Sequence, residues 1–193
     1  MRVTRGRAVM RGFRLGETVA MRSLFLRLVA LSMLALPGAC ATARTDVEPG
    51  TTFVLIRHAE KADDDPRDPS LSQAGRKRVD KLVSRLRDTP LTAVYASGYR
   101  RTQQTAAPIA AAHHLAVATY DAARPAADFA GALRSANPTG TVLVVGHSNT
   151  IPALAQALCS CDIGPTADSE YGRRITIRVL PDGRATVDDR REP

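Results

Sequence analysis

Short apolar runs alternate along this chain with longer segments in which apolar residues recur every three or four positions. Residues 53–56 and 142–145 are each four consecutive apolar residues, which is typical of strands buried on both faces of a sheet. Between them, residues 72–87 place Val79, Leu82, Val83 and Leu86 on one face of a helix that Ser72 would cap. The alternation predicts a mostly parallel sheet covered by helices on both faces.

The same pattern predicts the elements from residue 51 onward. The predicted strands are residues 52–56, 92–95, 115–119, 141–145, 175–180 and 185–187, and the predicted helices are residues 72–87, 99–112, 126–135 and 150–158. Asp182-Gly183 separates the last two strands and indicates a hairpin. The expected fold class is therefore α/β, a three-layer α/β/α sandwich with a mostly parallel central sheet and an antiparallel C-terminal edge.

Length and charge are consistent with one such domain. The chain has 193 residues, and a linker at residues 47–50 separates an N-terminal segment, residues 1–43, from a domain that we expect to span residues 51–193. The net charge of +8 is concentrated at the start of the chain, because residues 1–40 contain seven arginines and one acid. The rest carries only +2, and aromatic residues make up 4% of the chain, so no nucleic-acid partner is expected.

Residues 1–43 have the layout of an export signal. A basic region precedes the apolar stretch of residues 28–36, and small residues follow it. The apolar stretch is too short to span a bilayer as a helix, which favours a removable signal over a membrane anchor. Translation could begin at Met1 or at Met21, because residues 21–27 form a compact basic region of their own.

Cys40 resembles the lipid-modified cysteine of a bacterial lipoprotein, although Pro37 stands where an aliphatic residue is usual. Cleavage after Ala41 or Ala43 by ordinary signal peptidase is the alternative. We therefore expect an exported, periplasmic protein, either attached to a bacterial membrane through a lipid on Cys40 or soluble. An uncleaved cytosolic tail is the third interpretation.

Cys159 and Cys161 are separated by one residue near the end of a predicted helix. An exported protein could oxidise them, but a bridge across a single residue would be strained. We expect free, half-buried thiols at these positions.

Two of the predicted strands end in the same kind of residue. The first runs directly into Arg57-His58, and the fourth runs into Gly146-His147. Ligands of open α/β sheets bind at the carboxyl ends of strands, so two imidazoles and an arginine would meet if these strands were neighbours. A lone histidine at a strand end is more often held by a backbone carbonyl. The adjacent arginine and the second histidine favour a site that handles a phosphoryl group.

Four segments, in this order, resemble the histidine phosphatase superfamily, the clan of phosphoglycerate mutase. They are residues 55–61 (LIRHAEK), 71–75 (LSQAG), 95–106 (YASGYRRTQQTA) and 145–150 (VGHSNT). Each segment alone would be a weak signal. Together they span nearly all of residues 52–155, which makes a chance resemblance improbable.

The resemblance implies a role for each matching residue. In that family the arginine-histidine pair after the first strand carries the nucleophile, which here is His58, while Arg57 grips the phosphoryl oxygens. The spacing to the Gln-Thr-Ala stretch selects Arg101 over Arg100 as the second arginine. His147 corresponds to the second histidine, which closes the phosphate pocket and stabilises charge on the transferring group.

The proton donor for the leaving group is less well defined. Many members of the family use an acid between the second arginine and the second histidine, and this interval contains only Asp121 and Asp128. Asp128 fits the distance better, whereas Asp121 follows its strand more closely. Glu60 is a third candidate, and its alternative role is an ion pair with Lys61 or Arg57.

Specificity in such a fold comes from loops over the pocket, here chiefly residues 61–69 and 120–128. Lys61 and Arg67 in the first loop either meet a further anionic group of the substrate or are simply solvated.

The leading hypothesis is an exported phosphatase that acts on a small phosphomonoester through phospho-His58. A phosphoprotein substrate is less favoured, and a phosphoglycerate mutase-type phosphotransferase is disfavoured because the domain leaves little room for lid insertions. An exported phosphate-binding protein without turnover and a purely structural envelope lipoprotein are the alternatives from other classes. No cysteine or histidine cluster has zinc spacing, so we expect a metal-free site without a cofactor.

Overall fold

The apolar runs pair into one mixed sheet in the computed structural model, which describes residues 49–191. Its strands are β1 (Thr51–Arg57), β2 (Leu91–Ser97), β3 (Val117–Tyr120), β4 (Gly140–Gly146), β5 (Arg173–Val179) and β6 (Ala185–Arg191), in the order β3-β2-β4-β1-β5-β6. Strands β1 to β4 run parallel, whereas β5 is antiparallel to β1 and β6 to β5. The mostly parallel sheet with an antiparallel C-terminal edge is therefore confirmed.

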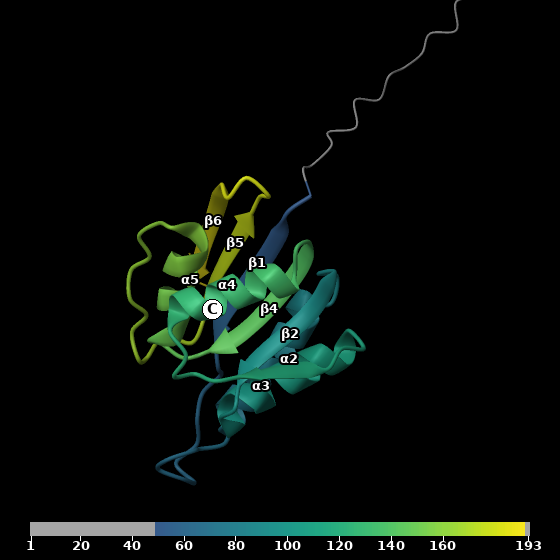
Figure 1. The fold of residues 1–193 in the computed structure, drawn as a ribbon. Helices are drawn as coiled ribbons and strands as arrows, with labels where there is room; N and C mark the ends of the chain where they lie inside the picture. Colours follow the sequence, from purple (N-terminus) through teal and green to yellow (C-terminus); the bar gives the residue numbers. More distant parts are fainter. Residues whose placement is uncertain (1–48, 192–193) are drawn as a thin grey trace, which may run out of the picture. The chain divides into compact units, whose positions relative to one another are not determined.

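Helices cover both faces of this sheet (Figure 1). They are α2 (Gln73–Leu86), α3 (Arg100–Ala112), α4 (Ala126–Ala136) and α5 (Thr150–Cys159). Along β1, Val54 and Ile56 join the core under α2 and α3, while Phe53 and Leu55 join the core under α4 and α5. Each such side chain contributes about 1.5–3 kcal/mol when it is fully buried. Burial on both faces explains why β1 is an unbroken apolar run.

The start of α2 is held against the end of β1. Ser72 caps the helix, since its Oγ accepts a hydrogen bond from Gly75 N (3.1 Å). A Cβ on Gly75 would lie 2.2 Å from the carbonyl oxygen of Glu60, so only glycine fits there. This close approach fixes the segment that follows β1, where the predicted nucleophile lies.

Most element boundaries lie within two residues of the predicted ones, and two of the differences have a clear physical reason. The strand expected to begin at residue 115 begins at Val117, because the chain leaves α3 through His114, which has a positive φ of 57°. There Leu115 N still donates to Ala110 O (2.9 Å). The last strand runs to Arg191 instead of residue 187, since polar residues extend the pairing with β5 along the sheet edge.

The predicted signal sequence and Cys40 lie outside residues 49–191, so export and lipid attachment stay predictions. Within that range, none of the helices is long and apolar enough to cross a membrane.

Candidate active site

The two predicted strand-end histidines are neighbours. Strand β1 pairs with β4 in parallel, with Arg57 opposite Gly146, so the chain leaves both strands at the same sheet edge. His58 N donates to Gly146 O (2.9 Å), and the ring centroids of His58 and His147 lie 5.4 Å apart. Both side chains are buried, with exposed fractions of 3% and 8%. The parallel pairing thus brings two imidazoles together, as the strand ends predicted.

The ends of neighbouring side chains come close to the backbone at the end of β4. A Cβ on Gly146 would lie 2.8 Å from Tyr120 Oη and 2.9 Å from Ile151 Cδ1. The turn that follows is held by Thr150, whose Oγ1 accepts a hydrogen bond from His147 N (3.0 Å). Helix α5 therefore begins directly behind His147, where the positive end of its dipole favours an anion.

The hydrogen bonds of His58 define which nitrogen is free to attack. Its Nδ1 lies 2.7 Å from the carbonyl oxygen of Ala59, which can only accept, so Nδ1 carries the hydrogen. Nε2 is then the unprotonated nitrogen, and it accepts a hydrogen bond from Arg101 Nε (3.3 Å). Burial, assisted by the charges of Arg57, His147 and Arg101, lowers the pKa of His58 to about 4 although the Ala59 carbonyl opposes the shift. The imidazole is therefore a neutral base at neutral pH.

Arg101 occupies the centre of this cluster, and Arg100 does not. Arg101 Nη2 lies 3.4 Å from His147 Nδ1, and the Arg101 guanidinium stacks on the Tyr99 ring at 4.5 Å from its centroid. Arg100 points outward, where its Nη2 lies 3.6 Å from the carboxylate of Asp64. The structure therefore brings the arginine that motif spacing selected, Arg101, to both histidines.

His147 has the opposite tautomer. Arg101 can only donate, so the His147 Nδ1 that faces it is an acceptor, and Nε2–H donates to Ser97 Oγ (2.9 Å). Burial, followed by the charges of Arg101 and Arg57, lowers the pKa of His147 to about 4. The second imidazole is thus also neutral in the absence of ligand.

Arg57 is held by a loop that the sequence motifs do not include. Its Nη1 donates to the carbonyl oxygens of Ala167 (3.1 Å), Asp168 (2.7 Å) and Glu170 (3.2 Å). The guanidinium also lies over the Tyr171 ring, 4.2 Å from its centroid. These contacts orient an arginine of which only 7% is exposed. Sequence reasoning missed the loop because its contribution is made by backbone carbonyls, which leave no signal in residue type.

One open cleft of about 410 Å³ connects the predicted residues. Arg57, His58, Arg101 and His147 line it together with Lys61, Tyr99, Ala122, Ala123 and residues 148–150. The lining has three cations and no carboxylate. A phosphoryl group in this cleft would meet the guanidinium groups of two arginines and the unprotonated Nε2 of His58.

None of the three predicted proton donors lines this cleft. Asp128 is exposed in the first turn of α4. Asp121 lines a neighbouring cavity, and its Oδ1 accepts a hydrogen bond from Ala123 N (2.9 Å). Glu60 pairs with Arg78 at 2.8 Å; burial alone would raise the pKa of Glu60, but the hydrogen bond from Arg78 holds it below its usual value. Glu60 is therefore in an ion pair, but its partner is Arg78 instead of Lys61 or Arg57, the two partners that the sequence suggested.

Two other carboxylates lie at the rim. Asp68 Oδ1 is 3.7 Å from Arg101 Nη1, and Asp168 Oδ1 accepts a hydrogen bond from Ser148 Oγ (2.9 Å). The side chain of Asp68 is 36% exposed and that of Asp168 is 94% exposed. Sequence reasoning missed both because it considered only Glu60, close to His58, and the interval between Arg101 and His147. The position of Asp68 in the loop after β1 is the signal that could have indicated it.

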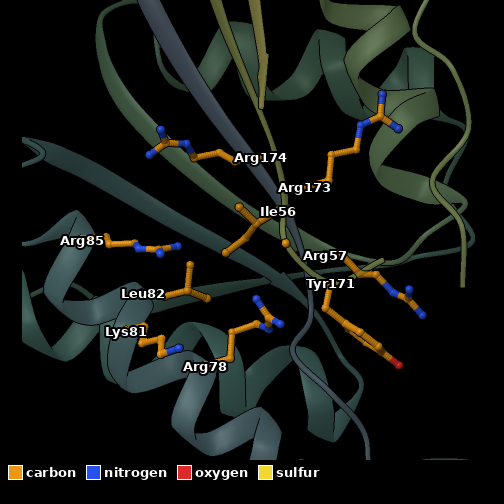
Figure 2. A pocket seen from close by; sticks show the side chains of 10 residues that line it. Ile56, Arg57, Arg78, Lys81, Leu82, Arg85, Tyr171, Arg173 and Arg174 are labelled. Atoms are coloured by element: carbon orange, nitrogen blue, oxygen red, sulfur yellow. The ribbon is translucent and has the colours of Figure 1, made fainter. Parts of the chain in front are cut away.

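A second group of cations lies behind Arg57 (Figure 2). It surrounds a cavity of about 20 Å³, lined by Ile56, Arg57, Arg78, Lys81, Leu82, Arg85 and residues 171–174. That space holds about one water molecule. The cluster therefore has the charge for an anion but not the room for a phosphoryl group.

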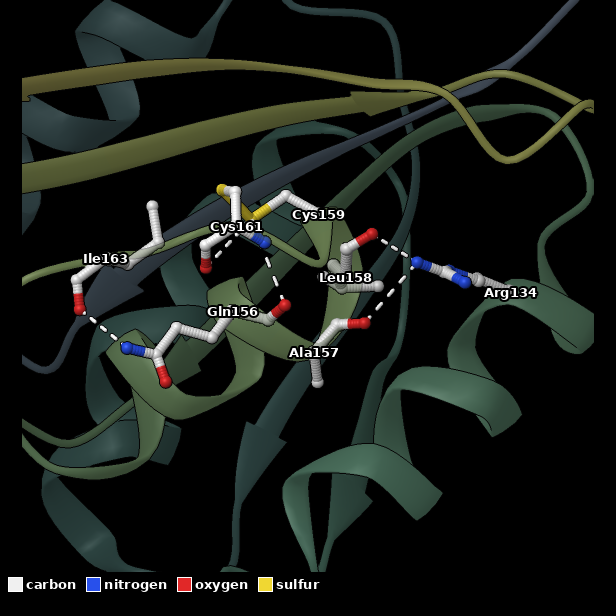
Figure 3. Close-up of a disulfide and its surroundings, with 7 residues drawn as sticks. All are labelled: Arg134, Gln156, Ala157, Leu158, Cys159, Cys161 and Ile163. Carbon is white, nitrogen blue, oxygen red and sulfur yellow. Dashed lines mark hydrogen bonds between the residues drawn. A yellow bond between two sulfur atoms is a disulfide. The ribbon is translucent and has the colours of Figure 1, made fainter.

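The expectation of free thiols is wrong, because Cys159 and Cys161 form a disulfide (Figure 3). Helix α5 ends at Cys159, and the next residue, Ser160, adopts a left-handed conformation with φ 54°. This tight turn brings the two Cα atoms to 5.2 Å, within the range that a disulfide spans. Neither cysteine lines the cleft.

The sequence matches a family model described as histidine phosphatase superfamily (branch 1) over residues 53–124. The matched part includes Arg57, His58 and Arg101, and His147 lies after it. No curated protein matches the sequence.

Solved structures share the fold at low identity. A structure of the protein histidine phosphatase SixA with tungstate aligns with a TM-score of 0.62 and 16% identity, covering 72% of this chain and 96% of that chain. A mycobacterial glucosyl-3-phosphoglycerate phosphatase aligns with a TM-score of 0.61 and 15% identity, covering 75% of this chain and 100% of that chain. A mycobacterial hydrolase aligns with a TM-score of 0.57 and 16% identity, covering 72% of this chain and 97% of that chain. The family model thus covers three of the four sequence segments that resemble this superfamily, and the solved structures share the fold.

Proposed function

We propose that this chain, which matches the histidine phosphatase superfamily in sequence and in fold, hydrolyses a small phosphomonoester through a phosphohistidine on His58. The observation that carries the proposal is the tautomer of His58. Its Nδ1–H donates to the Ala59 carbonyl, so the unprotonated nitrogen is Nε2, which lies beside Arg101 in the cleft. A neutral imidazole in this position can attack phosphorus without losing a proton first.

In the first step, His58 Nε2 forms a bond to phosphorus while the bond from phosphorus to the leaving oxygen breaks. Arg57 and Arg101 hold the non-bridging oxygens, and their charge is favourably placed for the transition state. His147 Nδ1 lies 3.4 Å from Arg101 Nη2, and it can donate to a phosphoryl oxygen once it has taken up a proton. In the second step, water attacks the phosphohistidine, the P–N bond breaks and phosphate leaves. The arginines supply positive charge, so the proposed reaction requires no metal or cofactor.

The leaving oxygen needs a proton, and we propose Asp68 as its source. Asp68 lies next to Arg101 and is less exposed than Asp168, the other carboxylate at the rim. Asp68 and Asp121 both line the neighbouring cavity, and the contact of Asp68 with Arg101, a cleft arginine, favours Asp68. Asp128 and Glu60 line neither space. In the second step the same carboxylate would accept the proton of the attacking water.

The experiment is hydrolysis of p-nitrophenyl phosphate by the purified domain, compared with His58→Ala. We expect kcat/KM to fall by about 10³-fold or more in the variant, because the covalent route is lost. Activity equal to that of His58→Ala at every pH from acidic to neutral would contradict the proposal. If phosphate still raised the melting temperature, the result would favour the phosphate-binding alternative.

A second candidate substrate is a protein phosphohistidine, as in the name of SixA. The lack of a carboxylate in the cleft lining favours it, because an imidazole leaving group can depart without a protein acid. A phosphohistidine peptide hydrolysed much faster than any alkyl phosphate would support this candidate over a phosphomonoester.

We also propose that the protein is exported, with Cys40 as the lipid attachment site. The Cys159–Cys161 disulfide supports an oxidising compartment. Labelling with radioactive palmitate in cells, compared between the wild type and Cys40→Ala, tests the attachment, and label that persists in the variant would contradict it.

A further inference from the structure

A second cavity of about 730 Å³ opens beside the cleft. Arg67 and Asp68 line it from the loop after β1, and Gly98 lines it from the turn before α3. The far wall is residues 119–123 at the end of β3. Tyr99, Ala122 and Ala123 line both cavities. A ligand whose phosphoryl group lies in the cleft can therefore extend past Tyr99 into this second space.

The loop that forms one wall is held in place by side chains. Asp65 Oδ1 accepts hydrogen bonds from Arg67 N (2.8 Å) and Asp68 N (3.1 Å), which closes a turn. Asp68 Oδ1 accepts a hydrogen bond from Arg100 N (2.9 Å), which ties the loop to α3. The wall is therefore formed before any ligand binds.

The opposite wall is equally well supported. Tyr120 stacks on Phe129, with ring centroids 4.2 Å apart, and its hydroxyl donates to Val145 O (3.3 Å). Burial raises the pKa of Tyr120 to about 12, so the phenol stays protonated and keeps this bond. The second cavity is thus a preformed space between two supported walls, as binding sites for small molecules usually are.

The two cavities differ in charge. The cleft has three cations and no carboxylate in its lining, whereas the second cavity has one cation, Arg67, and two carboxylates, Asp68 and Asp121. A second acidic group on the substrate would be repelled there, while hydroxyl groups could donate to the carboxylates. This argues against Arg67 as the partner of a further anionic group.

An aromatic ring separates the two spaces. Tyr99 is 41% exposed, more than the other large apolar side chains in the described part of the chain. Arg101 stacks on the ring and His147 meets it at its edge, which fixes its orientation. An aromatic face beside carboxylates suits a ring that has apolar C–H groups and hydroxyls together.

We propose that the second cavity is the leaving-group subsite and that it binds an uncharged, hydroxyl-bearing ring. The substrate class is then a sugar or nucleoside whose only acidic group is the phosphoryl group that is removed. This inference rests on the proposed function, because the ring is placed by a phosphoryl group held in the cleft.

A side chain introduced at Gly98 can fill the second cavity without entering the cleft. A Cβ there would meet only Thr119 Cγ2 at 3.8 Å, which is ordinary contact, and Gly98 does not line the cleft. Gly98→Leu therefore places a side chain in the second cavity without backbone strain. Gly131→Leu is the matched control, because nothing lies within 4 Å of a Cβ at that exposed helical position.

The experiment compares acetyl phosphate, which is too small to reach the second cavity, with a hexose phosphate and a nucleoside monophosphate. We expect Gly98→Leu to lower kcat/KM for the preferred ring substrate by about tenfold or more, and for acetyl phosphate by less than about twofold. Gly131→Leu should change neither. If kcat/KM falls more for the hexose phosphate, the ring is a sugar, and if it falls more for the nucleoside monophosphate, the ring is a nucleoside. An equal loss on all substrates, or no loss, would overturn the subsite.

A charge test sharpens the substrate class. Wild-type protein should hydrolyse hexose phosphate with higher kcat/KM than 3-phosphoglycerate, and Asp121→Asn should reduce that preference severalfold because it removes one repelling charge. A wild-type preference for 3-phosphoglycerate would overturn the inference that the ring is uncharged.

Failure of the proposed function would be recognised separately. If acetyl phosphate were not hydrolysed above the level of His58→Ala, catalysis would be contradicted, and calorimetric binding of hexose phosphate would then test the subsite. Gly98→Leu should weaken that binding about tenfold and leave inorganic phosphate binding unchanged. Equal binding of hexose phosphate by the wild type and Gly98→Leu would overturn the subsite on its own.

Discussion

Arg57 lines two spaces that both have cations in their walls. The two spaces differ in volume and in the other side chains that line them. The cleft of about 410 Å³ has Arg57, Lys61 and Arg101 around two neutral histidines. The cavity behind it has more cations in its lining but only about 20 Å³ of space. Positive charge is therefore not what marks the site. Room for a phosphoryl group and an unprotonated imidazole nitrogen are the features that the smaller cavity lacks.

The cations of the smaller cavity also have different partners. Arg78 pairs with Glu60 at 2.8 Å, and Arg173 pairs with Asp189 at 2.7 Å. These pairs tie α2 to the end of β1 and β5 to β6. In the cleft, Arg57 Nε and Arg101 Nη1 are buried and have no hydrogen-bond partner within residues 49–191, although Arg101 Nη1 lies 3.7 Å from Asp68 Oδ1. Buried donors of this kind are what an incoming anion can satisfy.

The largest effect is expected from Arg101, because it contacts both histidines. Arg101→Lys keeps the charge but loses the planar fork of donors, and we expect kcat/KM to fall by about 10²-fold. Arg100→Lys is the matched control and should change kcat/KM by less than about twofold, since Arg100 points toward Asp64. Steady-state kinetics on one phosphomonoester measure both. Equal losses in the two variants would remove the distinction between the neighbours.

The next effect depends on the leaving group. Asp68→Asn keeps the shape of the rim but cannot donate the proton, so kcat for an alkyl phosphate should fall by about tenfold or more. Acetyl phosphate releases a weakly basic carboxylate, and its turnover should change by less than about twofold. A loss of the same size on both substrates would assign Asp68 a structural role through its contact with Arg101.

Stability should depend on pH through the two buried imidazoles. The pKa of each is about 4 in the folded protein and 6.5 when unperturbed, so between these values the unfolded chain binds more protons. The free energy of unfolding should therefore fall as pH decreases from about 6.5 to 4, by about 2 kcal/mol for one histidine. Urea denaturation of the wild type and His147→Gln measures this, and the variant should show a shallower fall. Identical slopes would mean that His147 titrates normally in the folded state.

The smallest effect is expected in the cavity behind Arg57. Lys81→Gln removes one of its charges about a turn of α2 away from the ion pair of Arg78 with Glu60. We expect kcat/KM to stay within about twofold of the wild type, because exposed charges at a distance are screened. A loss comparable to that of Arg101→Lys would show that the two cationic regions act as one.

The parts of the site that local pattern could predict are those built from neighbouring residues. The apolar runs before His58 and His147 predicted strand ends, and the parallel pairing of β1 with β4 brought these ends together. Motif spacing separated Arg101 from Arg100. The strand ends could be predicted because strand burial is a local property of the sequence, and the choice of Arg101 came from the spacing of the motif that resembles the family.

The parts that could not be predicted depend on contacts between distant segments. Arg57 is oriented by backbone carbonyls more than a hundred residues away, and carbonyls look the same in every residue. Asp68 reaches Arg101 only because Asp65 closes its turn and Arg100 N binds its carboxylate. The disulfide of Cys159 depends on the left-handed φ of the next residue. Each is a consequence of tertiary geometry.

The central claim is that His58 becomes phosphorylated. The direct test is rapid quenching of the wild-type protein during turnover of a ³²P-labelled phosphomonoester, followed by peptide mapping. The account predicts a label that is stable to alkali and lost in acid, located on the peptide that contains His58, and absent from His58→Ala. Turnover without a protein-bound label at any quench time, or a label on another residue, would contradict it.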